Sequence, residues 1–333
     1  MIKKIYIPTI NSYSGGILVL AVLCKTLREL GYDARLLIIP YFPSKKVKRV
    51  RFIFDCLLKN IKFRIKSFIK KYAAKIFPTA KFVKYYKSAA DILKIENIKV
   101  QWHPFFNKEE SIVVYCDYIY GNPLGADKIA RWLLSFYQFK HDSNAYSKSD
   151  VFIAFREMFN DLSLNPNNYL VTLNYFNHQL YRQYNYKKRD GVCYIVYKGW
   201  NRTDLPKHFD GPVYKSSMLQ EDLVDMLNHY KYCYCYDTQS YYTIIAAVCG
   251  CIPIVIMEKG KTERDYLSPT EKHYGIAYGN TSEQIQYAID TRELLLQKLD
   301  YRESNIKNAK KMLSILVKHF GKIKQISHGN KTT

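Results

Sequence analysis

The sequence predicts an α/β protein with two Rossmann-like domains facing a central cleft, and three observations lead to that fold class. The chain has 333 residues, 48% of them hydrophobic, which suffices for two domains with separate cores. Its first 40 residues alternate strand, helix and strand, and a second such series begins near Gly191. We expect an N-terminal domain over 1–185, a C-terminal domain over 186–302 and a closing helix over 303–320, with ligand bound between the domains.

The opening unit is the clearest. We interpret "KKIYIPTI" as a strand, "NSYSGG" as a loop, "ILVLAVLCKTLRELG" as a helix and "YDARLLIIP" as a second strand. Short links between these elements predict a parallel pair with a right-handed crossover. Such sheets bind ligands at the carboxyl ends of their strands, where Gly15 and Gly16 would let backbone amides approach a phosphate or a sugar. A tight turn needing positive φ at one glycine is the alternative.

An insertion over 45–88 has a different composition. From Lys45 to Lys87 it holds fifteen Lys and Arg against one acid, Asp55, which is +14 of the total net charge of +22. Aromatic and aliphatic residues alternate with these charges, so we expect an amphipathic helix pair on anionic lipid. A solvated helical excursion is the alternative. Nucleic acid is an unlikely partner because no recognised nucleic-acid motif accompanies the charge.

The remainder of the first domain places polar residues after a buried strand. "SIVVYC" is predicted to end at Asp117, "YGNPLGA" to form a turn that contains Asn122, and "DKIARWLLSFY" to form a helix that begins near Asp127. "DVFIAF" and "NYLVTLNYF" are predicted strands, and "RQYNYKKRDG" is the expected linker. Asp117 and Asn122 therefore lie where a parallel sheet places its chemistry.

The second domain repeats the alternation. "GVCYIVYKG" predicts a strand that reaches Lys198, "EDLVDMLNHYK" a helix and "YCYCY" a strand. "YDTQSYYTIIAAVCGCIPIVI" then predicts a polar loop, a helix with a small-residue face and a buried strand. "IAYG" is a short predicted strand. "TSEQIQYAIDTRELLLQKL" and "YRESNIKNAKKMLSILVKHFG" are predicted helices.

Cysteines and hydropathy bear on the compartment. Eight Cys lie mostly inside apolar runs, which is typical of reduced core thiols in a cytosolic protein. Neither Cys-x-Cys pair has the spacing of common structural zinc sites. The N-terminus predicts no signal peptide, and the uncharged run Thr238–Met257 is interrupted by Gly250 and Pro253, so we interpret it as buried helix and strand. We expect a cytoplasmic protein peripherally associated with the inner face of the plasma membrane.

These motifs resemble those of glycosyltransferases of the GT-B fold. The resemblance rests on a glycine loop in the first βα unit, a basic residue on the first strand of the second domain, and a helix followed by "CGCIPIVI". The C-terminal signature of that family has two Glu separated by seven residues ahead of a small-residue helix. Alignment on "AVCGCIPIV" puts Asp237 in the first position and Ile245 in the second. Ile245 cannot replace the second Glu, which in that family binds the nucleotide ribose.

Four segments in order look similar to bacterial polysaccharide and lipopolysaccharide glycosyltransferases. They are "GNPLGA…RWLL", "YKG", "YDTQSYYTIIAAVCGC" and "YGIAYG". The resemblance implies transfer of a hexosyl or deoxyhexosyl group from a nucleotide-sugar to a lipid-linked or cell-surface glycan of lipopolysaccharide, O-antigen or capsule. The alternative is a non-catalytic GT-B-shaped glycan- or nucleic-acid-binding protein, which the missing Glu at Ile245 keeps open.

The resemblance also implies a donor site in the second domain. Lys198 would neutralise the departing diphosphate, with Arg202 as the alternative cation, while free amides and hydroxyls at the predicted helix start would meet phosphate or sugar. The expected donor-binding residues are Gly15, Gly16, Lys198, Arg202, Thr238, Gln239, Ser240, Tyr241, Tyr242 and Thr243.

Catalytic roles depend on the stereochemistry, which the sequence leaves open. An inverting enzyme requires a base on the acceptor, for which Asp117 is the candidate, whereas a retaining enzyme would use Asp237 near the donor sugar. His103 and His178 are reserve bases. We expect Asn122 and Arg131 to bind the acceptor. No convincing Asp-x-Asp metal motif occurs, so we expect no metal site and no cofactor beyond the nucleotide-sugar substrate.

Overall fold

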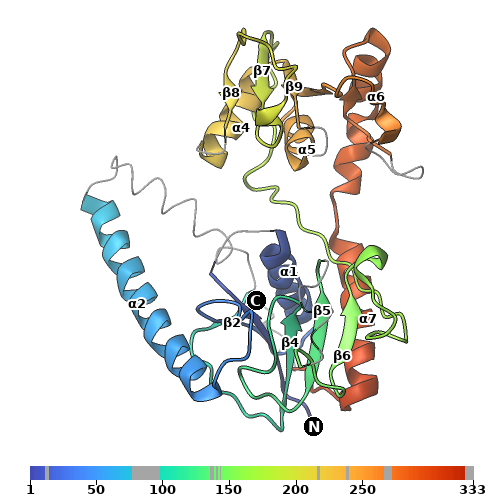
Figure 1. Cartoon of the computed structure of the whole chain (residues 1–333). Coiled ribbons are helices and arrows are strands. Elements are labelled where there is room, and N and C mark those ends of the chain that lie inside the picture. Colours follow the sequence, from blue (N-terminus) through green and yellow to red (C-terminus); the bar gives the residue numbers. More distant parts are fainter. Residues whose placement is uncertain are drawn as a thin grey trace, which may run out of the picture. The chain divides into compact units, whose positions relative to one another are not determined.

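The protein consists of two compact units, which are described separately below (Figure 1). The computed structural model describes residues 1–11, 15–76, 98–135, 139, 142, 144–215, 218–237, 240–265 and 272–326. The first unit comprises Met1–Tyr175 and Tyr301–Thr333, and the second comprises Phe176–Asp300. The chain thus leaves the first unit once and returns to it with its last helix.

The first unit contains a six-stranded parallel sheet in the order β3-β2-β1-β4-β5-β6. This is the strand order of a Rossmann fold, in which the order reverses between β1 and β4. Nearly every residue of the sheet is buried, as expected for a parallel sheet covered on both faces. The strands are β1 (Lys4–Thr9), β2 (Ala34–Ile38), β3 (Val100–Gln101), β4 (Ser111–Cys116), β5 (Ile129–Leu133) and β6 (Val151–Ala154).

Helices complete the first unit. They are α1 (Gly15–Glu29), α2 (Arg49–Ile76) and α7 (Arg302–Phe320), with a short 3-10 turn at Glu157–Phe159. The terminal helix α7 packs against α1 and adds Met312 and Leu316 to the core. Asn305 on α7 fixes the segment after β6 by bonding both the N–H and the carbonyl of Asn174. α7 is therefore an integral layer of the first unit.

The second unit contains a five-stranded parallel sheet in the order β11-β10-β9-β7-β8. The strand order reverses between β7 and β9, as in flavodoxin-like sheets, and ligands of such folds bind at this switch point. The strands are β7 (Val192–Ile195), β8 (Val213–Tyr214), β9 (Tyr232–Cys235), β10 (Ile252–Val255) and β11 (Ala277–Tyr278). The helices are α4 (Gln220–His229), α5 (Tyr241–Val248) and α6 (Ser282–Lys298), with 3-10 turns at Gly199–Asn201 and Glu263–Asp265.

The expectation of an α/β protein with two Rossmann-like parallel sheets is confirmed, but two details of the first unit were wrong. The segment predicted as a helix from Asp127 is strand β5, whose five residues are all buried between β4 and β6. A short apolar run of that kind cannot be assigned to helix or strand by its periodicity alone. "NYLVTLNYF" forms no strand, and its pairing with the sheet is limited to an isolated parallel bridge between Leu170 and Ala154 of β6.

The basic insertion contains one long helix, α2, over its described part. Its inner face buries Phe52 and Cys56, and Asn60 ties it to the sheet by donating to the carbonyls of Ile38 and Trp102 at 2.8 and 2.7 Å. The second member of the expected helix pair falls on 77–97, outside the described residues. Among the helices that the structure describes, none combines the length and the apolar character needed to cross a bilayer.

Candidate functional site

The switch point of the second sheet is organised by Asp237. This residue follows β9, and its Oδ1 atom accepts hydrogen bonds from the backbone N–H groups of Tyr197, Lys198 and Gly199 at 2.9, 2.8 and 2.9 Å. Asp237 is almost fully buried, at 1% exposure. A carboxylate that accepts several backbone hydrogen bonds fixes the conformation of the loop that donates them. Asp237 therefore joins the carboxyl ends of β7 and β9, as a positioning residue whose Oδ1 atom is already occupied.

Lys198 begins the 3-10 turn at the end of β7, and its side chain is exposed. Gly199 next to it lets the turn pass close to Tyr236, the residue that follows β9. A Cβ atom at position 199 would lie 2.5 Å from the carbonyl oxygen of Tyr236. The site thus presents the exposed cation of Lys198 on a loop whose conformation is fixed by the buried carboxylate of Asp237. Such a fixed cation suits an anionic ligand at the switch point.

The contacts of Arg202 in this structure are structural ones. Its side chain forms an ion pair with Asp204 at 2.6 Å and donates to the carbonyls of Tyr236, Ile256 and Met257. A guanidinium has five N–H donors, and these contacts occupy all of them. Arg202 joins the ends of β9 and β10, and Lys198 is the better candidate for binding a phosphate.

The start of α5 completes this edge of the sheet. Ser240 caps the helix by accepting from the N–H of Tyr242 at 3.3 Å, and its hydroxyl lies 3.5 Å from Oδ2 of Asp237. Thr243 is buried and donates to the carbonyl of Ser240. Tyr241 is exposed. Thr238 and Gln239, also expected to bind the donor, lie outside the described residues.

A pocket of about 490 Å³ opens beside Lys198, at the carboxyl ends of β7 and β8. Its lining includes two exposed aromatic side chains, Tyr197 and Trp200, and the cation of Lys215, which directly follows β8. Trp200 is 73% exposed, an unusual position for a tryptophan, and its ring is suited to stacking on a planar base. Sequence reasoning missed all three residues, although the Trp that follows "YKG" was a signal for them.

The matching edge of the first unit is organised by Asp117. This residue follows β4 and accepts from the N–H groups of Leu134 and Ser135 and from the Ser135 hydroxyl, the last at 2.6 Å. Burial raises the pKa of Asp117 above the ordinary carboxyl value, and the bonds from Ser135 and Leu134 offset part of that rise. Gly16 in the first turn of α1 lies next to Leu134, 3.9 Å from its Cδ1 atom to an ideal Cβ. The structure thus brings Gly16 and Asp117 to one edge, on either side of the switch point.

Arg131 and Asn122, which were expected to bind the acceptor, both form hydrogen bonds within the first unit. Arg131 is 1% exposed, pairs with Asp150 at 2.5 Å and donates to the carbonyls of Ile119 and Gly121. Asn122 bonds both the N–H and the carbonyl of Ala126. Both side chains stabilise the turn between β4 and β5, and this geometry offers no acceptor contact for Arg131.

The remaining candidates are the two reserve bases and the thiols, of which Cys116 ends β4 and Cys235 ends β9 and donates to the carbonyl of Asp237 at 3.3 Å. His103 stacks beside Phe105, and His178 contacts the carbonyl of Leu299 at 3.3 Å. All eight cysteines are buried free thiols, so the prediction of core thiols is confirmed. Cys193, Cys233 and Cys251 form one cluster, and hydrogen bonds from the other two thiols lower the pKa of Cys193. Within the described ranges, no three His, Cys, Asp or Glu side chains are grouped as metal ligands would be.

Comparisons with known proteins gave only distant structural similarities. No family model and no curated protein matched the sequence. Similar solved structures include the glycosyltransferase SnogD from Streptomyces nogalater, at 13% identity and TM-score 0.37, with 95% of this chain and 99% of that one covered. A glycosyltransferase from Rickettsia africae ESF-5 has 10% identity and TM-score 0.41, with coverages of 96% and 98%. With TM-scores below 0.5, these similarities establish no shared fold, and the fold given above rests on the two sheets themselves.

Proposed function

We propose that this protein is a GT-B glycosyltransferase that transfers a sugar from a nucleotide-sugar to a lipid-linked or cell-surface glycan. One observation carries the proposal: Asp237 fixes the loop of Lys198 at the switch point of the second sheet, beside the start of α5 and an aromatic pocket. In the ordered motifs of the sequence, the same residues resemble the donor site of bacterial polysaccharide glycosyltransferases. The donor diphosphate would meet Lys198, and the base would stack on Trp200.

Chemistry at this site needs charge stabilisation more than a nucleophile. When the bond between the anomeric carbon and the diphosphate breaks, negative charge develops on the leaving oxygen, and a fixed ammonium such as that of Lys198 stabilises it. The acceptor hydroxyl must lose a proton as the new glycosidic bond forms, and Asp117 is the proposed base for an inverting reaction. Its raised pKa makes it a stronger base than an ordinary carboxylate. Asp237 acts on the donor side by holding the Lys198 loop.

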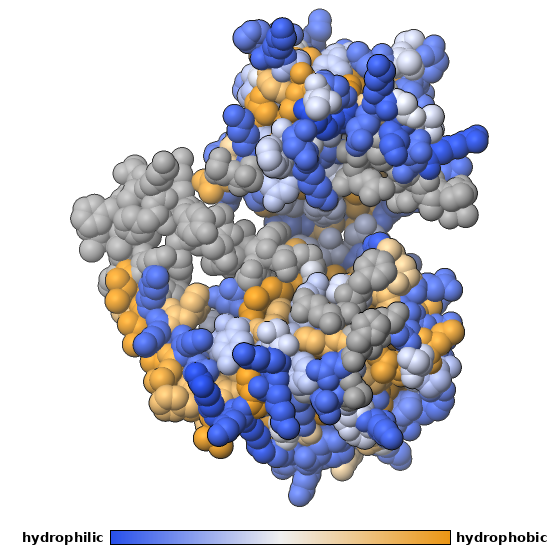
Figure 2. Space-filling model, in the orientation of Figure 1, coloured by the Kyte–Doolittle hydropathy of each residue, from blue (hydrophilic) through white to orange (hydrophobic). Residues whose placement is uncertain are grey.

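The exposed face of α2 supports an acceptor held at a membrane. Five apolar residues follow each other at helical spacing and, at 100° per residue, fall within an arc of about 80°. All five side chains are exposed, and basic residues flank the arc on both sides. In Figure 2, orange apolar residues run along α2 at the lower left with blue residues between them. The outer stripe consists of Val50, Phe54, Leu58, Ile61 and Ile65, and the flanking cations are Arg51, Lys62, Lys66 and Arg64.

A single exposed apolar residue is ordinary, but a stripe along about four turns of one helix indicates a docking surface. Cationic flanks next to apolar side chains match the surface of an anionic bilayer, with the apolar stripe inserted among the lipids. We propose that this stripe places the enzyme on the inner face of the plasma membrane, where lipid-linked glycans are built.

A non-catalytic protein of the same shape is the second candidate, and one observation favours it. Ile245 on α5 stands where the resemblance to GT-B glycosyltransferases would place the second Glu, and it is a buried residue at 1% exposure. No carboxylate is therefore available there to bind a ribose. A protein that has lost turnover would still bind a nucleotide or a glycan.

A ligand panel tests the donor site itself, which both candidates would retain, whereas turnover separates the enzyme from the non-catalytic protein. The full-length chain would be heated with each common nucleoside diphosphate and nucleotide-sugar. A ligand at one hundred times its Kd stabilises the folded state by about 2.7 kcal/mol, which raises Tm by several degrees. We expect stabilisation by one base and by its nucleotide-sugars. If no nucleotide raises Tm, the donor site proposed here is wrong.

A further inference from the structure

A second pocket, outside the proposed donor site, lies in the first unit between α2 and the segment that leads into β4. It encloses about 350 Å³, within the range of small-molecule sites. Its walls include Val50 and Ile53 from the first turns of α2, Phe105, and Leu124 from the turn before β5. Nothing in the proposed glycosyl transfer uses this pocket.

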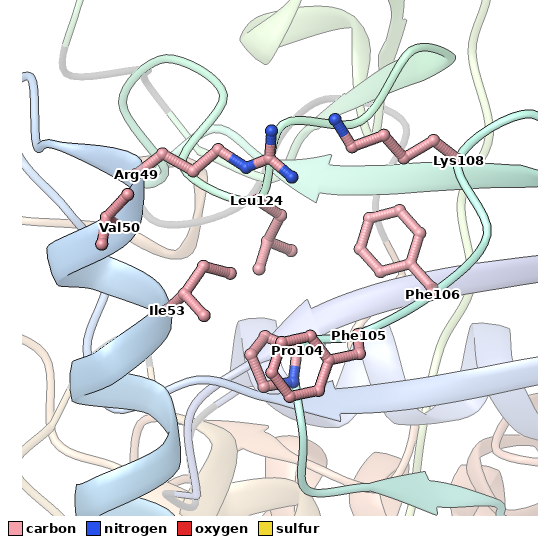
Figure 3. Close-up of a pocket in the computed structure, with 8 residues that line it drawn as sticks. All are labelled: Arg49, Val50, Ile53, Pro104, Phe105, Phe106, Lys108 and Leu124. Carbon is pink, nitrogen blue, oxygen red and sulfur yellow. The ribbon is translucent and has the colours of Figure 1, made fainter.

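Charge and apolar surface are segregated within the pocket. Figure 3 shows Arg49 and Lys108 extending toward each other along one edge, with Leu124, Ile53 and Phe105 beyond them. Among the described residues, neither cation forms an ion pair. A pair of cations at one edge of an apolar wall complements a molecule with an anionic head and an apolar chain.

The position of the Arg49 side chain is restricted by the backbone at Gly125. Gly125 has φ +66°, and a Cβ atom there would lie 2.5 Å from Cζ of Arg49. The guanidinium therefore packs directly against this glycine, which limits its freedom before any ligand binds. Phe106, the residue after Phe105, is anchored by its contact with Tyr6, at 5.0 Å between ring centroids. One side of the pocket thus packs against the turn before β5, and the other side packs against β1.

Val50 links this pocket to the outer stripe of α2. It lines the pocket, and at 83% exposure it is also the first residue of the stripe. We propose that the pocket binds an anionic amphiphile, with the phosphate or carboxylate head between Arg49 and Lys108 and the start of the apolar chain against Ile53, Phe105 and Leu124. The inference rests on this geometry and not on sugar transfer, so it can hold even if the proposed function fails.

Isothermal titration with dodecyl phosphate below its micelle concentration tests the proposal. We expect saturable binding at one molecule per chain. Inorganic phosphate and the neutral amphiphile dodecyl maltoside should each bind at least about tenfold more weakly, because each lacks one half of the recognised chemistry. Equal binding of inorganic phosphate would reduce the site to an anion site, and equal binding of the maltoside to a general apolar groove. Either result would overturn the proposal.

Variants assign the binding to this pocket. Arg49→Gln with Lys108→Gln should weaken dodecyl phosphate by about 10–100-fold, the loss expected for charge-assisted hydrogen bonds. Lys310→Gln with Lys311→Gln is the matched control, because it removes the same charge from exposed positions on α7 that neither line the pocket nor flank the outer stripe. An equal loss in both double variants would show unspecific charge attraction and contradict the proposal. A lipid source is distinguished by pelleting with vesicles that contain phosphatidic acid, in which the pocket variant should lose more than the control.

Discussion

The backbone N–H of Lys198 donates to Oδ1 of Asp237 at 2.8 Å, which joins the proposed phosphate-binding loop to the loop in front of α5. The first unit has a counterpart, since Asp117 accepts from the N–H of Ser135 at 3.1 Å. In both units a buried aspartate after one strand holds the loop that follows the neighbouring strand. Each aspartate therefore shapes the edge at which its sheet would bind a ligand.

Removing the carboxylate of Asp237 tests its positioning role. Asp237→Ala would leave three backbone N–H groups without their acceptor and should lower the free energy of unfolding by about 3 kcal/mol or more. Asp237→Asn retains an acceptor oxygen and should cost about 1 kcal/mol, while transfer falls through kcat because the loop loses its charged anchor. Chemical denaturation and steady-state kinetics measure the two effects. Near wild-type turnover in Asp237→Asn would contradict the claim that the charge of Asp237 positions the Lys198 loop for transfer.

Lys198→Ala should weaken binding of the donor nucleotide by about 10–100-fold, the value of a charge-assisted hydrogen bond to phosphate. The side chain is exposed, so the fold should be unaffected. Lys207→Ala removes an exposed lysine from the same unit and is the control. Unchanged nucleotide-induced stabilisation in Lys198→Ala would contradict the assignment.

Trp200 offers an optical probe of the pocket beside Lys198. The chain has 3 tryptophans, and this one is 73% exposed and lines the pocket. Stacking of a base on the indole should quench and shift its emission, and Trp200→Phe should abolish most of the nucleotide-dependent change while binding persists. A signal that survives in Trp200→Phe would place the base away from this pocket.

Gly16→Ala separates structure from ligand approach. Gly16 lies in α1, and among the described residues a Cβ atom there meets Leu134 alone, at ordinary van der Waals distance, so the variant should be more stable by up to about 1 kcal/mol. If the glycine exists to admit a substrate, activity should fall although stability rises. A stable variant with full activity would mean that Gly16 makes no close contact with substrate.

The pKa of Asp117 predicts a pH dependence of stability. Burial raises this pKa above its unfolded value of about 3.9, so the folded state binds the proton more tightly. The stability that protonated Asp117 contributes is fully present below the unfolded pKa and is lost as pH rises through the folded pKa. Relative to wild type, Asp117→Asn should therefore become more stable between pH 4 and pH 7 in urea unfolding.

Asp142 provides a control of opposite sign for that measurement. The Tyr120 hydroxyl and the N–H of Asn144 hold the pKa of Asp142 below its ordinary value. Asp142→Asn should therefore lose stability relative to wild type as pH rises. The same trend in both variants would contradict the assignment of the effect to Asp117.

The outer stripe of α2 predicts attachment to anionic membranes. Each basic residue near such a surface contributes about 1 kcal/mol, so the four flanking cations would hold the protein reversibly, and apolar insertion would leave part of the binding resistant to salt. Co-sedimentation with anionic and neutral vesicles measures this. Phe54→Ser with Ile61→Ser should abolish the salt-resistant part, since both side chains are exposed on the stripe. If the wild type does not pellet with anionic vesicles, the stripe has another role.

Much of the fold could be predicted because buried parallel strands and amphipathic helices leave strong local patterns. The units around β1, β4, β7 and β9 all follow from apolar runs bounded by turn residues. β5 could not be recognised, since a five-residue buried run has no period that distinguishes a strand from a helix. The two-residue strands β3 and β8 were not predicted, whereas the equally short β11 was predicted from "IAYG".

Of the candidate site, only the positions of residues at strand ends could be predicted from the sequence. The sequence placed Lys198 and Asp237 at strand ends, and the sheet brings those ends together. The sequence could not show that Oδ1 of Asp237 already accepts hydrogen bonds from three backbone amides. Nor could it show that the side chain of Arg202 donates to backbone carbonyls. Such contacts depend on how loops from separate strands meet, which no local pattern encodes.

The central claim is turnover of a nucleotide-sugar at the Lys198 edge, and release of nucleoside diphosphate in a coupled assay tests it most directly. Wild type, Lys198→Ala and Lys207→Ala would be assayed against a panel of nucleotide-sugars, with lipid-linked glycan acceptors or water as the acceptor. We predict turnover of one donor class, a loss of at least about tenfold in kcat/KM for Lys198→Ala, and little change for Lys207→Ala. Nucleotide binding without turnover of any donor, or equal turnover in wild type and Lys198→Ala, would contradict it.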